Sequence, residues 1–352
     1  MNLLSLSLSA LAVSHAFSGN VVATPITGLQ TLQQFNAVVL GDLNSNSHVD
    51  GRTYVGGNAS GGDYVQHVSD TPASRYAGLS VGGNAVNVKV NGLGAVVRGN
   101  LSNSTVNAGG SVINGNVANS NLNGAAFVGG TASGSNFNGG RLSTMNSEMQ
   151  SQASASGSTD FSAVLSGLSG TLRQMGSTGS SVSFNGAGKA TFNAVSNASG
   201  TAVFDLSSYD DRLFQASEFT FNMNGASTVI FNSDNTNITI GANFLGGSAQ
   251  TLGASMIWNF FNAATVTTNS QFGGSLLAPK AFLTNNQNIE GGVYVKQLQQ
   301  NGELHLQSFT GTLGQTVLAQ SVVAVPEPTP IALLLAGLGC LGFMRRKAAI
   351  KA

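Results

Sequence analysis

A short repeat rich in glycine and asparagine constrains the fold of this chain more than any other feature. Gly-Asn pairs at residues 99–100 and 115–116 stand 16 residues apart, and a Ser-X-X-Asn pattern begins at Ser104, Ser120 and Ser135, at intervals of 16 and 15. A unit of this length cannot bury its own apolar face, whereas stacked copies bury a shared core. The repeat therefore predicts a β-solenoid.

Each repeat is expected to form short strands joined by tight turns. Val86, Val88 and Val90 alternate with polar residues, which is the pattern of a strand with one buried face. Glycine and asparagine adopt the positive φ angles of tight turns, so we interpret the Gly-Asn pairs as turns rather than as ligand-binding loops. Stacked asparagine side chains are also expected to hydrogen-bond along the solenoid axis. We assign residues 35–141 to solenoid turns.

A helical segment is predicted to follow this repeat. Six apolar residues lie at helical spacing after Asp160, a plausible N-cap, and such a stripe normally packs along a sheet. Residues 142–158 form either a second helix or a looser connection, so the helical insertion covers about residues 142–176. The six apolar residues are Phe161, Val164, Leu165, Leu168, Leu172 and Met175.

Strand patterns resume after the helix. Apolar and polar residues alternate in several segments between residues 219 and 240, and Gly-Gly pairs begin at Gly273 and Gly291, 18 residues apart. We therefore expect one all-β solenoid domain over residues 24–311, with an inserted or accompanying α-helix. The ends of a solenoid need caps against edge-to-edge pairing, and the N-terminal segment is a candidate cap.

Charge and cysteine content limit the functions open to the chain. Only 8% of its residues are charged, and 14 basic residues balance 14 acidic ones, so the basic surface that nucleic-acid binding requires is missing. One cysteine cannot form an intramolecular disulfide or a multi-thiolate metal site. These features favour a secreted, non-enzymatic protein without a cofactor and without a nucleic-acid partner.

Residues 1–23 are predicted to be a signal peptide. The apolar run from Leu3 to Val13 is too short for an ordinary membrane span, and small residues after it place cleavage behind Ala16 or Ala23. No lysine or arginine precedes the run, so a buried N-terminal strand or helix is the alternative.

The C-terminal residues 325–352 have three parts that resemble a PEP-CTERM sorting signal. A proline-rich motif is followed by an apolar helix over residues 331–344 and by a basic cluster, which would hold its end on the cytoplasmic side. The apolar stretch has 14 residues, fewer than the ~20 of a full bilayer span, and residues 312–324 form a linker before the signal. The residues of the motif and the cluster are Val325, Pro326, Glu327, Pro328, Arg345, Arg346 and Lys347.

The resemblance to a sorting signal implies an address. The chain is expected to be exported, to be anchored transiently in the inner membrane by its C-terminal helix, and then to reach the cell surface or the extracellular space. It implies an exosortase-type processing enzyme as a partner, in bacteria that make extracellular polysaccharide. A plain C-terminal anchor is the alternative.

Motifs at both ends of the domain resemble the choice-of-anchor A domain of bacterial surface and secreted proteins. This resemblance implies a surface or secreted location and brings no catalytic residues with it. Phe261 departs from the family pattern, which has proline there. The closing motifs also resemble the ice-binding adhesin fold, but a fold does not fix a function. The matching segments are residues 35–42, 49–52, 55–58, 257–260, 274–279, 290–293, 302–305 and 309–311.

Residues 42–50 resemble part of a calcium-binding loop. Asp42 and Asp50 would supply oxygen ligands for a hard cation. However, Ser47 and Thr53 stand where such a loop has its glycine and its bidentate glutamate. A hydrogen-bonded Asx turn is therefore favoured over calcium binding.

Two further charged groups are candidate sites. Glu303 and His305 alternate on an expected strand and face the same side, either as a structural polar pair, which is favoured, or as an acid–base pair. The cluster Asp210-Asp211-Arg212 is interpreted as the solvated start of a helix. We assign no catalytic, cofactor-binding or metal-binding residue.

The sequence therefore predicts an exported structural or adhesive protein of the cell surface or extracellular matrix. Its neutral faces, rich in asparagine, serine and threonine, are expected to hydrogen-bond extracellular polysaccharide, and salt screens such contacts little. An ice-binding adhesin is one alternative, which a flat threonine-rich ladder would favour. A polysaccharide-cleaving enzyme is the other, and it would need a facing pair of carboxylates.

Overall fold

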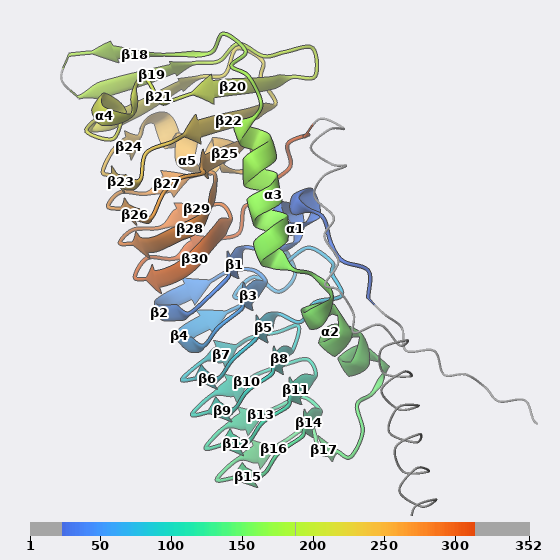
Figure 1. The fold of residues 1–352 in the computed structure, drawn as a ribbon. Coiled ribbons are helices and arrows are strands. Elements are labelled where there is room, and N and C mark those ends of the chain that lie inside the picture. Colours follow the sequence, from blue (N-terminus) through green and yellow to red (C-terminus); the bar gives the residue numbers. More distant parts are fainter. Residues whose placement is uncertain (1–22, 187, 314–352) are drawn as a thin grey trace, which may run out of the picture.

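Parallel β-strands stack into a three-sided solenoid in the computed structural model, which describes residues 23–186 and 188–313. One turn of the repeat contains three short strands, and each pairs with its counterpart in the next turn (Figure 1). Thr105, for example, pairs with Asn121, so the 16-residue spacing seen in the sequence is the length of one turn. The predicted β-solenoid is confirmed, and its strands are parallel.

The lower half of the stack is built from residues 37–142. Each turn contributes one strand to a face covered by helices, one to an exposed face, and one to a third face; the longer β2 and β4 bend across the last two. The strands are β1 Ala37–Val39, β2 Leu43–Val49, β3 Thr53–Val55, β4 Ala59–Tyr64, β5 Leu79–Val81, β6 Ala85–Val86, β7 Lys89–Val90, β8 Ala95–Val97, β9 Leu101–Ser102, β10 Thr105–Val106, β11 Ser111–Ile113, β12 Val117–Ala118, β13 Asn121–Leu122, β14 Ala126–Val128, β15 Ala132–Ser133, β16 Asn136–Phe137 and β17 Arg141–Leu142.

The upper half is built from residues 181–305. Most of its strands continue the same three faces, and β18, β19, β21 and β24 form a separate four-stranded sheet at the top. The strands are β18 Ser181–Asn185, β19 Lys189–Asn193, β20 Thr201–Asp205, β21 Glu218–Asn222, β22 Thr228–Ser233, β23 Asn237–Ile240, β24 Asn243–Phe244, β25 Met256–Phe260, β26 Thr265–Thr268, β27 Phe272–Gly273, β28 Ser275–Asn285, β29 Ile289–Glu290, β30 Val293–Gln300 and β31 Leu304–His305.

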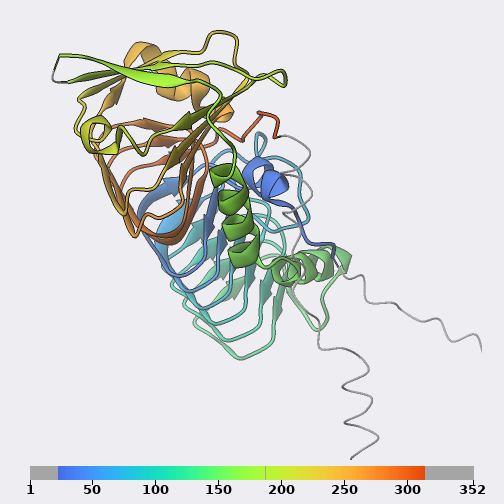
Figure 2. The same ribbon diagram turned by 45° about the horizontal axis from the view of Figure 1, so that its top comes forward.

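The chain does not climb the stack in sequence order. It starts in the middle, runs down to β17, returns along the outside in α2 and α3, and then descends from the top to end beside its own start (Figure 1). Figure 2 shows the turns one behind another, with α1, α2 and α3 along one side. The helices are α1 Gly28–Gln34, α2 Ser147–Ser158, α3 Phe161–Arg173, α4 Asp210–Leu213 and α5 Ser248–Leu252, with single 3-10 turns at Leu245–Gly247 and Gly253–Ser255.

The two halves meet where β1 pairs in parallel with β30. The Asn36 side chain joins them, because its Nδ2 donates to the carbonyls of Gly291 and His305 while its Oδ1 accepts from the Gly51 amide. The Tyr294 hydroxyl donates to the carbonyl of Phe35. The opening and closing motifs of the sequence are therefore neighbours in space.

Helix α3 forms as the sequence predicts. Asp160 is its N-cap, and the side chain accepts from the Ala163 amide. The apolar stripe packs on the outer side of the covered face, against β22, β25 and β28. Two buried asparagines continue this contact: Asn259 bonds the hydroxyl and carbonyl of Ser169, and Asn232 bonds the carbonyl of Leu172.

Turn length sets the size of the core residues. In the lower half, turns of 16 residues enclose valine, leucine and alanine. In the upper half the turns are longer: Asn232 and Asn259, which are paired on adjacent strands, are 27 residues apart. The wider upper turns are filled by aromatic rings gathered around Trp258. Interiors pack without voids, so a wider turn requires larger side chains.

Polar ladders run along the solenoid at its corners. The backbone amide of Asn84 donates to Asn58 Oδ1 in the turn above it. In the same way the Asn100 amide donates to Asn84 Oδ1, and the Asn116 amide donates to Asn100 Oδ1. The preceding turn leaves no room for a side chain at this corner, because a Cβ on Gly56 would lie 2.2 Å from the Leu40 carbonyl oxygen. The predicted asparagine stacking is confirmed.

The ends of the stack differ from the sequence-based expectation. The four-stranded sheet covers the upper end, and β15, β16 and β17 form the lower end, where Arg141 lies over the Phe137 ring and donates to the carbonyl of Gly130. The described part of the N-terminal segment forms α1 beside α3, in the middle of the stack. The prediction that this segment caps an end is wrong for those residues.

The Asp210-Asp211-Arg212 cluster is only partly solvated. These residues begin α4, as predicted, but Asp210 is 6% exposed and accepts a hydrogen bond from the Ser233 hydroxyl. Burial, assisted by the nearby Asp234, raises the pKa of Asp210 to about 6. The first carboxylate of the cluster therefore faces inward, toward Ser233 at the end of β22.

The predicted signal peptide and sorting signal lie outside the described residues, apart from Ala23. Within residues 23–186 and 188–313, no helix has the length and apolar character needed to cross a membrane.

Candidate functional site

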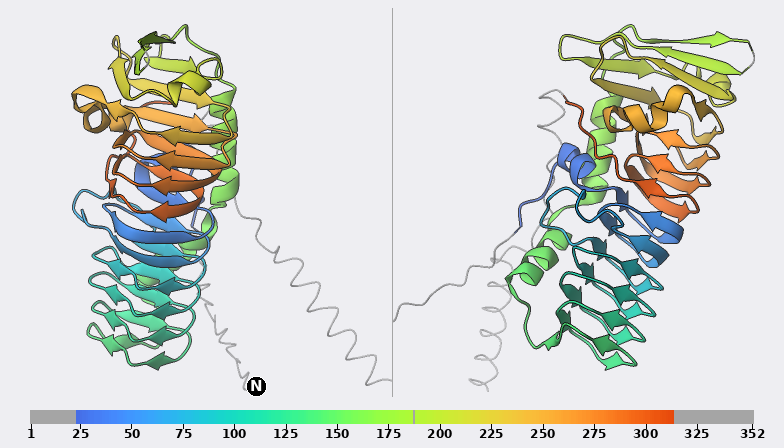
Figure 3. Two further views of the ribbon diagram at one scale, coloured as in Figure 1. Left: turned by 90° about the vertical axis from the view of Figure 1, so that its left-hand side faces the viewer. Right: turned by 180° about the vertical axis from the view of Figure 1, so that it is seen from behind.

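The exposed face of the solenoid presents side chains in a regular array. It consists of β23, β26, the second parts of β28 and β30, and the strands from β2 and β4 down to β15. Thr239, Thr267 and Thr284 lie on three adjacent strands in register and point outward, because their neighbours at alternate positions are buried. Adjacent strands are about 4.8 Å apart, so the hydroxyls repeat at that spacing. Figure 3 (left) shows strands crossing the molecule beside α3.

A second outward column runs beside the threonines. It contains Asn237, Thr265, Phe282 and Gln297 on consecutive strands, and the Thr265 hydroxyl donates to Asn237 Oδ1. Phe282 is 43% exposed and is the one aromatic residue among the exposed large hydrophobic residues of the described chain. A flat ring with polar neighbours on its own face offers an apolar surface bordered by hydrogen-bonding groups.

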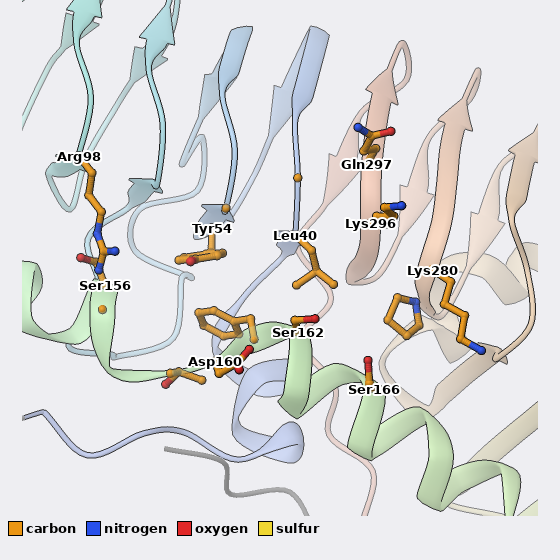
Figure 4. Close-up of a pocket in the computed structure, with 16 residues that line it drawn as sticks. Leu40, Tyr54, Arg98, Ser156, Asp160, Ser162, Ser166, Lys280, Lys296 and Gln297 are labelled. Carbon is orange, nitrogen blue, oxygen red and sulfur yellow. The ribbon is translucent and has the colours of Figure 1, made fainter. Parts of the chain in front are cut away.

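A groove of about 690 Å³ lies at the corner between this face and the covered face. Figure 4 shows Tyr54 and Leu40 in its floor, Arg98 beside Ser156 at one side, and Lys280 and Lys296 at the other. The N-terminal turn of α3 forms its outer wall. Gln297 lines the groove and also stands beside Phe282, so the groove opens onto the exposed face.

The groove is cationic. Arg98, Lys280 and Lys296 line it, and none of them forms an ion pair with the residues that the structure describes. The one acidic residue in the lining is Asp160, whose carboxylate already caps α3. Unpaired cations around a hollow of this size attract anionic groups.

A second pocket, of about 380 Å³, lies on the third face where β29, β31 and β2 stack. The strand register places Glu303 beside His48, and His305 between Glu290 and Asp50, because these residues flank the buried Ile289, Leu304 and Val49. His305 Nδ1 is 2.7 Å from Glu290 Oε1, and His305 Nε2 is 2.7 Å from Glu303 Oε2.

Two carboxylates of this pocket are nearly fully buried. Asp50 is 4% exposed and accepts from the Leu306 amide, and Glu290 is 3% exposed and accepts from Gln271. Burial alone would lower the pKa of His305, but the hydrogen bonds with Glu303 and Glu290 outweigh it and raise that pKa. The hydrogen bond with His305 also holds the pKa of Glu303 below its ordinary value.

Residues 42–50 form neither the Asx turn that the sequence favours nor a calcium loop. Leu43–Val49 is a strand, so Asp42 and Asp50 stand at its opposite ends and no loop wraps them around one ion. Asp42 is not in a local Asx turn either, since its Oδ1 accepts from the amide and side chain of Asn58 in the next turn. Asp50 belongs to the histidine pocket instead.

Sequence reasoning found part of these sites. Glu303 and His305 do face the same side and touch, as predicted. Their partners His48, Asp50 and Glu290 were missed, because only the parallel register of β29, β31 and β2 brings them together. The alternation within residues 237–240, 265–268 and 282–285 indicates outward columns, but it does not show that these strands are neighbours.

The fold and the exposed face define a class of protein: a repetitive β-solenoid that presents an extended, regular surface. Residues 28–306 match the family model described as Putative Ice-binding-like adhesive domain, and the chain belongs to this family. Membership indicates an adhesin-like protein of the surface or extracellular space. No curated protein and no solved structure matches the chain.

Proposed function

We propose that this protein is an exported adhesin that binds extracellular polysaccharide along its exposed β-face. The observation that carries the proposal is Phe282, an exposed aromatic ring set among in-register threonine, asparagine and glutamine side chains. A sugar ring has an apolar face of C–H groups and a rim of hydroxyls. The aromatic ring matches the apolar face, and the polar columns match the rim.

The periodicity of the face suits a polymer. Each strand adds another copy of the same outward positions, so successive sugar units meet similar groups. Each contact is weak, but a chain that engages several strands gains affinity through multivalency. The cationic groove beside Gln297 would accept the carboxylate of an acidic sugar in the same chain.

Export and sorting complete the proposal. Residues 1–23 would direct secretion, and the motif at residues 325–328 with the basic cluster at residues 345–347 would anchor the chain until processing, as in the choice-of-anchor A and PEP-CTERM resemblances. The protein acts by binding and not by catalysis in this proposal. Intact mass of the protein recovered from the cell surface tests the sorting step, and a mass that still includes residues 325–352 would contradict it.

Replacing Phe282 by alanine is expected to weaken binding to the producer's extracellular polysaccharide by about tenfold. A partly exposed ring that stacks on a ligand contributes on the order of 1–1.5 kcal/mol, and 1.4 kcal/mol corresponds to tenfold in affinity. The residue lies outside the core, so the stability of the fold is expected to change little. Binding is measured by calorimetry or surface immobilisation, at low and at high salt.

Val195→Ala provides the matched control, because Val195 is another exposed apolar side chain and lies near the upper end of the solenoid, away from Phe282. Unchanged affinity in Phe282→Ala would rule out the face as the binding surface. The double variant Lys280→Gln/Lys296→Gln separates the groove from the face. A loss confined to low salt in that variant assigns the groove to acidic sugars, because salt screens exposed charges.

Ice binding is the second candidate function, favoured by the in-register column of Thr239, Thr267 and Thr284. A flat, repeated array of hydroxyl and methyl groups can order water into a lattice. The bulky Phe282 beside this column interrupts the array, which favours polysaccharide. Thermal hysteresis that is lost in Thr267→Leu, together with absent polysaccharide binding, would reverse this preference.

A further inference from the structure

The histidine pocket has the composition of a metal site. We propose that His48, Glu303 and His305 bind a divalent transition-metal ion, with Zn²⁺ as the best match, where the N- and C-terminal strands meet. One ligand atom from each of these side chains lies within 4.8 Å of the other two. Two imidazoles and one carboxylate are a known donor set for zinc, which leaves a fourth position open.

The parallel register creates this arrangement. Val49 pairs with Leu304, so the residues before them, His48 and Glu303, project side by side from adjacent strands. His305 projects beyond Leu304 on the same strand, and its Nε2 turns toward Glu303. His48 Nε2 is 3.6 Å from the same Glu303 oxygen, close to the separation of two ligands on one tetrahedral ion. His305 Nε2 is 2.7 Å from that oxygen, so these two atoms would move apart by less than about 1 Å to share an ion.

The charge balance of the pocket calls for a cation. Three carboxylates, Asp50, Glu290 and Glu303, line it together with three imidazoles, and no lysine or arginine is part of the lining. Two of these carboxylates, Asp50 and Glu290, belong to nearly buried residues. Buried charges are normally paired or coordinate a metal.

Glu290 occupies the place of an outer-shell partner. It contacts His305 Nδ1, so Nε2 is the nitrogen that faces Glu303 and would act as the ligand. The position of Glu290 itself is held by Gln271 and Gln307. Carboxylate–histidine–zinc triads orient the imidazole in this way.

The donor set also selects the kind of metal. Imidazole suits Zn²⁺, Cu²⁺, Ni²⁺ and Fe²⁺, whereas Ca²⁺ and Mg²⁺ prefer sites made only of oxygen ligands. An ion here would connect β2 to β31, which come from opposite ends of the domain. Since the unfolded chain does not bring these residues together, binding would stabilise the fold.

The test uses the purified full chain, stripped with a chelator, and measures Zn²⁺ binding by calorimetry and thermal unfolding with and without Zn²⁺. We expect one ion per chain, a rise of several degrees in melting temperature that the chelator reverses, and no rise with Ca²⁺ or Mg²⁺. Co²⁺ is expected to give the visible absorption of a low-symmetry site. No stoichiometric binding at micromolar Zn²⁺, or an equal response to Ca²⁺, overturns the proposal.

Variants identify the ligands. His48→Gln and Glu303→Gln are each expected to weaken Zn²⁺ binding by more than tenfold, and both side chains are partly exposed, so the metal-free fold should persist. Glu290→Gln should weaken binding by about tenfold through the orientation of His305. His67→Gln is the matched control, because His67 lines the pocket but is not one of the three ligands. Equal loss in His67→Gln would refute the ligand assignment.

Discussion

Replacing Trp258 by alanine is expected to lower the free energy of unfolding by about 4 kcal/mol, within the range found for buried tryptophan or phenylalanine truncations. The side chain is fully buried, its ring stacks on Phe231 with centroids 4.0 Å apart, and Phe219, Phe272 and Phe192 also lie within about 6 Å. Its indole N–H donates to the Gly273 carbonyl, which would lose this partner. The loss is measured by urea or guanidinium unfolding followed by circular dichroism.

The size of the effect depends on the width of the upper turns. A narrow 16-residue turn can close around a small cavity. In the upper half, the aromatic side chains around Trp258 are held in place by 27-residue turns and cannot move inward to fill the space that Trp258 leaves. Trp258→Phe should therefore recover much of the loss, since an aromatic ring still fills part of the space. A change below about 1 kcal/mol in Trp258→Ala would show that the upper core is loosely packed.

The lower half of the fold is predictable from sequence because its information is local. The 16-residue repeat predicts the length of one turn, and the alternation over residues 86–90 predicts which side chains are buried. The α3 stripe and the Asp160 cap are also local signals, and both are confirmed. In the upper half the turns are longer and vary in length, so no fixed period connects strands such as β22 and β25.

The order of the turns could not be predicted in the same way. Nothing local in the sequence states that β1 pairs with β30, and the pairing depends on α2 and α3 carrying the chain back to the top of the stack. This is why capping by the N-terminal segment was the wrong expectation: β1 already has partners on both sides, β3 and β30. A strand that is paired on both edges lies inside a sheet and cannot end it.

The same long-range pairing explains what was missed in the candidate sites. Glu303 and His305 are visible as a pair because they are two residues apart. His48 and Glu290 join them only after β2 and β29 have paired with β31. The exposed face is built likewise, with β26 and β28 contributing Thr267 and Thr284 from separate turns. Each proposed site therefore depends on the register of parallel strands, and a change that loosens that register should weaken both.

Helix α3 is the element that holds this arrangement, and Asn259→Leu is expected to cost about 3 kcal/mol by detaching it. The Asn259 amide donates to the Ser169 carbonyl and to Asn232 Oδ1, and its oxygen accepts from the Ser169 hydroxyl at 2.6 Å. Leucine has a similar volume but leaves these buried groups without partners, and each orphaned group costs roughly 1–3 kcal/mol.

The experiment is an equilibrium unfolding series with Asn286→Leu as its control, because Asn286 is an exposed asparagine of a surface ladder, where substitutions change stability by about 0.5 kcal/mol or less. A double-mutant cycle with Ser169→Ala isolates the contact between helix and sheet. Coupling of 1 kcal/mol or more would assign the loss to that contact. Additive losses would show instead that Asn259 acts within the sheet, through Asn232, and that the apolar stripe alone holds α3 in place.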